Sequence, residues 1–194
     1  MTSRTKESAS APAVKGEVPC HGPENELQME ELTQSTPHAI VHAARELLLE
    51  YGRFVLAQTG AAQFCFGSLE KEADDLPASF LDQGGGSLLA LVKHHPAGFI
   101  AWRALTPTAT VAPDSWEVKR LWVRPAYRGL RLGRTLTQAV VDRAVAAGRK
   151  AVYLDTAPQS MAAAYRLYQD MGFRNCARYN ENPVEGLTWM VKSL

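Results

Sequence analysis

The chain has 194 residues, and its 46% hydrophobic and 21% charged content is typical of a soluble globular protein with room for one full domain. A formal net charge of +1 gives no reason to expect nucleic acid or a membrane surface as a partner. Three widely separated cysteines indicate neither a disulfide framework nor a metal site, and they suit a reducing compartment. We therefore expect a cytoplasmic protein without a bound metal.

The N-terminal segment, residues 1–24, differs in composition from the rest of the chain. It is rich in Ser, Ala, Pro, Glu and Lys, which is typical of disordered tails, and it has no apolar stretch like that of a secretory signal. No apolar run in the sequence approaches the roughly 18–20 residues that a membrane span needs. We predict a disordered tail over 1–24 and a single domain over 25–194.

Apolar periodicity predicts the elements of the first half of the domain. They are a weak strand over 25–34, a helix that opens at Thr36-Pro37, a second helix over about 68–80, and strands over 87–92 and 97–104. Only the polar turn His94-His95-Pro96 separates the two later strands, so they should form an antiparallel hairpin. Adjacent histidines in a turn point apart and no third ligand is in view, so we predict no metal site there.

The second half of the domain shows clearer patterns. They predict a strand over 116–123, a helix over 128–147 that stops at Gly148, a strand over 151–155, a helix over 160–171, and strands near 174–179 and 187–192. A strand, a long helix and a second strand make a βαβ unit, so the strands over 116–123 and 151–155 should be parallel.

The turn before the long helix combines features of a phosphate-binding site. A helix N-terminus offers unpaired N–H groups and a partial positive charge, and Gly129 and Gly133 allow phosphate oxygens to approach the main chain. Arginines, whose forked side chains suit phosphate oxygens, crowd the same stretch at Arg120, Arg124, Arg128, Arg131 and Arg134. The turn is neither a P-loop nor a Rossmann fingerprint. The alternative interpretation is a solvated basic helix start.

Two motifs resemble the GNAT superfamily of acyl-CoA-dependent N-acyltransferases. The signature of that family is Arg or Gln, two residues, Gly, one residue, then Gly or Ala, and Arg128 and Gly133 match it. The run from Ala163 to Phe173 looks like the late helix of the family, with alanines, Leu-Tyr and a closing Gly-Phe. The resemblance is clearest over 115–175. Arg131 departs from it, because a glycine is usual there, and so does Met161, where the family often has an Asn that binds the pantetheine arm.

The resemblance implies an α/β fold with a mixed, mostly antiparallel sheet, one parallel βαβ unit and flanking helices. It also implies acetyl-CoA as co-substrate and direct attack by a primary amine on the thioester, without an acyl-enzyme. Leu121 and Val123 should contact the pantetheine arm through their main chain. The residues expected to bind the coenzyme are Leu121, Trp122, Val123, Arg128, Gly129, Leu130, Arg131, Leu132, Gly133 and Arg134.

Two residues are candidates for catalysis. Strand alternation places Glu117, Lys119 and Leu121 on one face, and Glu117 could relay the proton of the amine. The alternative for Glu117 is a solvent-facing carboxylate paired with Lys119. Tyr168 matches the tyrosine that points at the coenzyme sulfur in the family, where its hydroxyl would stabilise the leaving thiolate. The alternative for Tyr168 is core packing, because it lies on an apolar helical stripe.

The acceptor pocket is expected, by resemblance, to be bordered by Tyr51, Arg103, Lys119, Asn180 and Asn182. Its mixed charges fit a small zwitterion or a polyamine as easily as the N-terminus of a protein, so the acceptor is a small-molecule amine or a peptide amine, and the protein could act as a monomer or a homodimer. Two alternatives to an enzyme remain open. One is a non-catalytic acyl-CoA-binding module that serves as a sensor or docking domain, and the other is an unrelated phosphate-binding α/β protein.

Overall fold

The computed structural model describes residues 27–59 and 69–194, so the predicted tail over 1–24 lies outside the described residues. The elements in chain order are β1 (Leu27–Glu31), α1 (His38–Thr59), α3 (Ala78–Leu81), β2 (Gly86–Val92), β3 (His95–Leu105), β4 (Ser115–Val123), the short 3-10 turn η1 (Pro125–Tyr127), α4 (Leu132–Ala146), β5 (Ala151–Thr156), α5 (Ala162–Asp170), β6 (Arg174–Asn175) and β7 (Thr188–Ser193).

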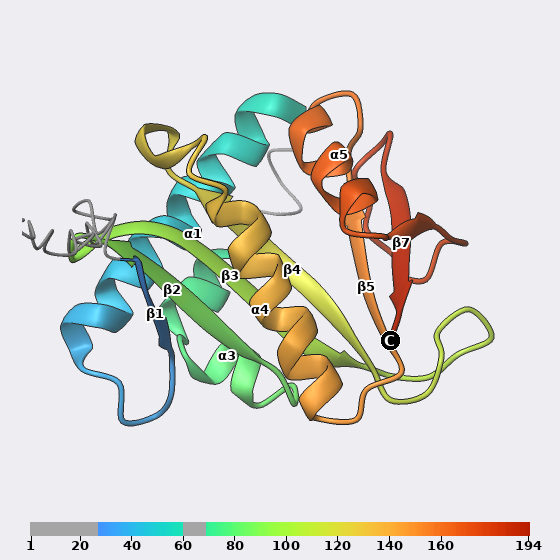
Figure 1. Cartoon of the computed structure of the whole chain (residues 1–194), viewed down its shortest axis with the longest axis horizontal. Coiled ribbons are helices and arrows are strands. Elements are labelled where there is room, and N and C mark those ends of the chain that lie inside the picture. Colours follow the sequence, from blue (N-terminus) through green and yellow to red (C-terminus); the bar gives the residue numbers. More distant parts are fainter. Residues whose placement is uncertain (1–26, 60–68) are drawn as a thin grey trace, which may run out of the picture.

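The strands form one seven-stranded sheet in the order β1-β2-β3-β4-β5-β7-β6 (Figure 1). Only the β4–β5 pair is parallel, and the other neighbours pair antiparallel. The connection between β4 and β5 contains α4, as a parallel crossover requires. The predicted mixed sheet with one parallel βαβ unit is confirmed.

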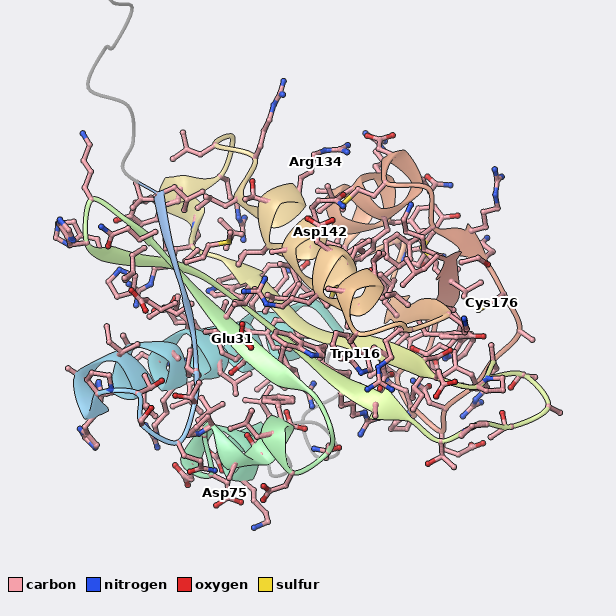
Figure 2. All side chains as sticks on the ribbon, turned by 60° about the horizontal axis from the view of Figure 1, so that its bottom comes forward. Glu31, Asp75, Trp116, Arg134, Asp142 and Cys176 are labelled. Atoms are coloured by element: carbon pink, nitrogen blue, oxygen red, sulfur yellow. The ribbon has the colours of Figure 1, made fainter. Side chains whose placement is uncertain are left out.

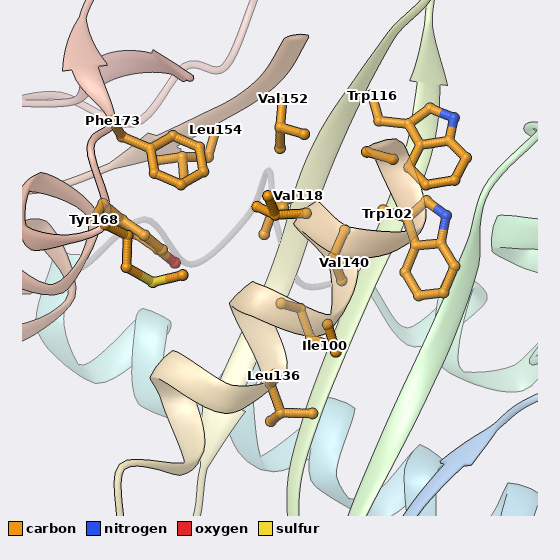
Figure 3. Packing of buried hydrophobic residues seen from close by; sticks show 14 of the residues in the cluster. Ile100, Trp102, Trp116, Val118, Leu136, Val140, Val152, Leu154, Tyr168 and Phe173 are labelled. Carbon is orange, nitrogen blue, oxygen red and sulfur yellow. The ribbon is translucent and has the colours of Figure 1, made fainter. Parts of the chain in front are cut away.

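Helices cover both faces of the sheet. In Figure 1, α4 crosses the front of the sheet and α1 runs behind it. The apolar stripe of α4, which includes Leu136, Val140 and Ala144, is fully buried against the sheet in one cluster together with residues of α5. Figure 3 shows this packing, with Tyr168 and Phe173 beside Leu154. The opposite face has its own cluster under α1 and α3.

A β-bulge in β4 changes the alternation of its side chains. Ala101 of β3 pairs with Lys119 and Phe99 pairs with Trp122, so β4 has one residue more than β3 over this stretch, and Arg120 has a φ of 60°. Leu121 consequently packs on the α4 face, whereas Lys119 stays on the α1 face opposite Ala101. The prediction that Glu117, Lys119 and Leu121 share one face is therefore wrong for Leu121.

The parallel pair of β4 and β5 is short. It joins only residues 115–117 to residues 151–153, with Glu117 opposite Tyr153 as the last pair. Beyond this point the two strands separate, which leaves the second half of β4 with a free edge toward β5. The separation opens space in the middle of the sheet, at the carboxyl ends of both strands, where ligands bind in open α/β sheets.

Three predicted boundaries in the first half need correction. The helix predicted over 68–80 is two helical segments, residues 69–74 and α3, because the turn at 75–77 contains Pro77, which has no N–H for a helical hydrogen bond. The hairpin turn is formed by Lys93 and His94, which both have positive φ, as two-residue hairpin turns require. His95 is therefore the first residue of β3 and not a turn residue.

Two boundaries in the second half also differ. The long helix begins at Leu132 instead of residue 128, because Gly129 and Arg131 have left-handed φ values of 87° and 59° that an α-helix cannot contain. The strand predicted near 174–179 is limited to β6, since the chain beyond Cys176 turns inward and places Tyr179 on Glu117.

Candidate active site

A groove of about 890 Å³ lies between the N-terminal ends of α4 and α5 and the free edge of β4. It is lined by Tyr51, Phe54, Leu121, Trp122, Val123, Tyr127, Arg128, Gly129, Arg131, Leu132, Gly133, Arg134, Ser160, Met161, Ala162, Ala163, Ala164 and Leu167. All of the predicted coenzyme-binding residues line it except Leu130, which is exposed. Met161 lines the groove at the position where the resemblance expects the pantetheine arm, whereas Phe54 and residues 162–164 were not predicted, because no local pattern indicates that α1 and α5 meet at β4.

The turn at one end of the groove presents unpaired backbone donors. Within the described part of the chain, the amides of residues 129–134 donate no hydrogen bond, whereas the amide of Arg128 donates to Pro125 and that of Thr135 to Arg131. The left-handed residues Gly129 and Arg131 turn this stretch so that it leads into the first turn of α4. The side chain of Arg131 is exposed, as its position in the turn requires. Such a helix start favours an anion.

The five arginines near this turn divide into two groups. Arg120 donates to Glu72 with both Nε (2.8 Å) and Nη2 (3.0 Å), and Arg124 pairs with Glu50 at 2.8 Å, so these two are held by carboxylates outside the groove. Arg128 lies over the rings of Phe54 (5.7 Å) and Trp122 (5.3 Å). The cluster available to a ligand in the groove is therefore Arg128, Arg131 and Arg134. Arg134 projects from the first turn of α4 (Figure 2).

A second, smaller pocket of about 90 Å³ occupies the separation between β4 and β5. It shares Tyr51, Leu121, Met161 and Ala164 with the groove, so the two spaces adjoin. Its other lining residues are Val55, Val118, Lys119, Arg120, Asp155, Thr156, Ala157, Tyr168, Asn182, Val184 and Leu187. Of the residues predicted to border an acceptor, Tyr51, Lys119 and Asn182 line this pocket, and Arg103 and Asn180 do not.

The position of Tyr168 is compatible with both interpretations, catalysis and core packing. It is 5% exposed, belongs to the buried cluster under α4, and meets Phe173 edge-on at 5.7 Å between ring centroids. It also lines the small pocket, and its hydroxyl has no hydrogen-bond partner among the described residues. Burial, with smaller effects of Tyr51 and Asp155, raises the pKa of Tyr168 above that of an ordinary phenol. The hydroxyl is thus a neutral donor on a residue that lines the pocket.

Glu117 is fully buried and lines neither space. Its Oε2 accepts from Nε of Arg103 at 2.7 Å, and its Oε1 accepts from the Tyr179 hydroxyl and from Nδ2 of Asn180, both at 3.0 Å. Burial alone would raise the pKa of Glu117, but the charges of Lys119 and Arg103 and the hydrogen bonds lower it below its usual range.

This environment favours neither a general base nor a solvent-facing carboxylate at Glu117, although the predicted pairing with Lys119 is present, with Nζ 3.6 Å from Oε1. A carboxylate whose oxygens are all occupied and whose pKa is lowered is a poor general base. It is also not a solvent-facing carboxylate. Its partners come from β3, β4 and the loop after β6, so it ties these segments together beside the small pocket.

Asp155 is the acidic residue of the small pocket that sequence patterns did not indicate. Its Oδ2 accepts from Nδ2 of Asn180 at 2.7 Å and from Nδ2 of Asn182 at 3.3 Å. Asn180 thereby bridges Glu117 and Asp155, and its own Oδ1 accepts from Nε1 of Trp189 at 2.9 Å. The signal that could have identified Asp155 is its place at the carboxyl end of a parallel strand.

Comparison with known proteins agrees with this geometry. A profile of the Acetyltransferase (GNAT) family matches residues 41–173. The chain is 32% identical over 105 residues to an uncharacterized N-acetyltransferase of Schizosaccharomyces pombe, covering 54% of this chain and 56% of that protein. It is similar to an acetyltransferase from Streptococcus agalactiae, with a TM-score of 0.67, 18% identity, and 87% and 98% of the two chains covered. It is also similar to PaiA N-acetyltransferase from Thermoplasma acidophilum, solved in complex with coenzyme A, with a TM-score of 0.57, 18% identity, and 87% and 99% covered.

The mixed sheet with its one short parallel pair is the fold that the chain shares with these solved acetyltransferases. The chain belongs to the GNAT acetyltransferase family, whose profile matches more than half of it. It spans about half the length of the curated relative from Schizosaccharomyces pombe. None of the helices in the described ranges has the length and apolar character needed to cross a membrane.

Proposed function

We propose that the chain transfers an acetyl or similar small acyl group from acetyl-CoA to a primary amine by direct attack of the amine on the thioester. The observation that carries this proposal is the continuity of the groove with the small pocket. One end of the groove offers the unpaired amides of residues 129–134, and the other end adjoins the pocket that Tyr168 faces. A ligand with a diphosphate and a long flexible arm matches such a groove.

In this proposal the diphosphate of the coenzyme binds at the start of α4, where the helix dipole, the amides and Arg128, Arg131 and Arg134 favour negative charge. The pantetheine amides hydrogen-bond the free edge of β4 like an added strand, through main-chain groups of Leu121 and Val123. Met161 cannot replace the hydrogen bond of an Asn side chain, so it contributes apolar contact to the arm.

The chemistry places one demand on the acceptor and one on the leaving group. An amine with a pKa near 10.4 must lose its proton before attack, which costs roughly 4–5 kcal/mol at pH 7. The thiolate, with a pKa near 8.5, needs only about 2 kcal/mol of stabilisation. The hydroxyl of Tyr168 can provide the latter as a hydrogen-bond donor without giving up its proton.

A covalent acyl-enzyme plays no part in the proposal. Among the described residues, Cys176 is half-buried in a separate cluster with Val111, Ala151 and Tyr153, and it lines neither the groove nor the small pocket. Burial raises the pKa of its thiol, which lowers the fraction of reactive thiolate at neutral pH.

The test is a screen of primary amines with acetyl-CoA. Release of free thiol is followed with a thiol reagent, and the acetylated product is identified by mass spectrometry. We expect amine-dependent thiol release with one acetyl group added per thiol. Binding of acetyl-CoA without turnover of any amine would contradict the proposal and would support the non-catalytic acyl-CoA-binding module.

Gly133→Val should raise the dissociation constant of acetyl-CoA at least about tenfold, or about 1.4 kcal/mol. A Cβ at Gly133 would lie 3.3 Å from Cδ2 of Leu167 and 3.9 Å from Cδ2 of Leu121, so one added carbon already fills the space beside the glycine. The two methyl groups of Val would therefore extend into the groove. The constant is measured by titration calorimetry. Ala146→Val, at the exposed far end of α4, is the matched control. Unchanged binding in folded Gly133→Val would exclude this turn as the phosphate site.

A further inference from the structure

The small pocket has charges of opposite sign on its two strand walls. The parallel register pairs Glu117 with Tyr153, so Lys119 and Asp155, each two residues further along, would stand opposite each other if the ladder continued. The strands instead separate, and within the described chain Lys119 and Asp155 form no ion pair with each other. Both residues line the pocket. An acid and a base that line one pocket without pairing leave room for a ligand that meets both.

Asp155 is held so that one oxygen remains available. Both hydrogen bonds to its carboxylate, from Asn180 and Asn182, end on Oδ2, and no described residue donates to Oδ1. The two amides come from the loop between β6 and β7, and Asn180 is itself fixed by Glu117 and Trp189. A carboxylate oriented in this way is preorganised to accept a hydrogen bond from an ammonium or amine group.

The ammonium group of Lys119 also has N–H donors that make no hydrogen bond within the described chain. Its Nζ lies 3.6 Å from Oε1 of Glu117, longer than a hydrogen bond, and that oxygen already accepts from Tyr179 and Asn180. The side chain of Lys119 is only 16% exposed. A largely buried ammonium without a close hydrogen-bond acceptor is a favourable partner for the carboxylate of a ligand.

We infer that the small pocket binds an acceptor amine that also carries a carboxylate, that is, a free amino acid or a similar small zwitterion. Asp155 receives the amine and Lys119 receives the carboxylate. This inference rests on the proposed function and names the substrate class of the same site. A volume of about 90 Å³ suits such a compact head group. A polyamine would bring a second cation toward Lys119, and the terminus of a polypeptide would bring no adjacent carboxylate.

The reaction balances without any further reactant. The ammonium gives one proton to solvent, and the lone pair of the neutral amine forms the C–N bond to the thioester carbonyl. The nitrogen of the adduct carries a positive charge, which the carboxylate of Asp155 stabilises across the pocket. The C–S bond then breaks with its electron pair on sulfur, and the second nitrogen proton passes to the thiolate to give the free thiol. The products are the N-acetylated amino acid and coenzyme A.

The experiment compares three forms of each acceptor: the amino acid, its amide, and the amine that lacks the carboxyl group altogether. For the wild-type protein we expect kcat/KM to be about 10–100-fold higher for the amino acid than for the other two, because a site built for a charged partner is left unsatisfied without it. The ratio of kcat/KM values is independent of the fraction of folded protein, so a loss of stability cannot imitate the result.

Two variants test which residue binds the carboxylate of the ligand and which binds its amine. Lys119→Met should reduce the preference for the amino acid over its amide to less than about threefold, chiefly by lowering kcat/KM for the amino acid. Asp155→Asn should lower kcat/KM about tenfold or more for all three acceptors alike, because all three share the amine. Lys150→Met and Asp142→Asn, both exposed and outside the two spaces, are the matched controls; Asp142 lies on α4 in Figure 2. Acetyl-CoA binding should stay unchanged in all four variants.

The outcomes are distinct. If amino acids are preferred and Lys119→Met removes the preference, the inference is supported. If the protein acetylates amines or amides as well as amino acids, or if Lys119→Met leaves the preference intact, the inference is overturned and the proposed function stands. If no acceptor of any of the three kinds is acetylated although acetyl-CoA binds, the proposed function fails and the inference fails with it.

Discussion

Tyr168→Phe is expected to lower kcat about 10–100-fold while the Michaelis constant for acetyl-CoA changes little. Tyr168 lines the small pocket and its hydroxyl has no partner in the described chain, so we expect its hydrogen bond to form only as negative charge develops on the sulfur of the leaving group. Removing a hydroxyl that makes no hydrogen bond and fills little volume should change the free energy of unfolding by less than about 1.5 kcal/mol. Steady-state kinetics and thermal melting measure the two quantities.

Tyr165→Phe is the matched control on the same helix. Its hydroxyl donates to Oδ1 of Asn175 at 3.3 Å and does not line either space, so its removal should leave kcat unchanged. Wild-type turnover in Tyr168→Phe would make that residue a member of the core alone. A rise in the Michaelis constant for acetyl-CoA with unchanged kcat would instead indicate that the hydroxyl contributes to binding of the ground state.

The parts of the site that follow from local chemistry could be predicted from the sequence. Gly129, Gly133 and three of the five arginines, Arg128, Arg131 and Arg134, line the groove at the start of α4, because helix ends and glycines affect only neighbouring residues. The crossover rule likewise predicted the parallel pair of β4 and β5. These inferences need no knowledge of how distant segments meet.

The parts that depend on packing between distant segments could not be predicted. The bulge at Arg120 shifts Leu121 to the other face of β4, and strand alternation alone gives no sign of it. Glu117 is buried because Arg103, fourteen residues earlier, and Tyr179, sixty-two residues later, both reach it. Arg120 and Arg124 leave the phosphate site for the same reason, since Glu72 and Glu50 lie on segments that precede them by 48 and 74 residues.

Glu117→Gln should lower the free energy of unfolding at pH 7 by about 2–4 kcal/mol. The carboxylate is fully buried, and its removal leaves Arg103 and Lys119 without their shared negative partner. The Gln side chain would also direct its NH₂ group at hydrogen-bond donors that now bind the carboxylate, and two donors cannot form a hydrogen bond with each other. Denaturant unfolding measures the difference, with Glu185→Gln on the exposed loop before β7 as the control.

The pH dependence of this difference gives a sharper test of what Glu117 does. Its pKa is lower in the folded protein than in the unfolded chain, where a Glu titrates near 4.3. The stability that it contributes is therefore fully present above about pH 4.3 and is lost as the pH falls through the folded value. The gap between the wild-type protein and Glu117→Gln should be constant from pH 8 to about 5 and should narrow below about pH 4. A variant that keeps its stability but loses activity with a changed acidic limb of the pH–rate profile would restore Glu117 as the general base.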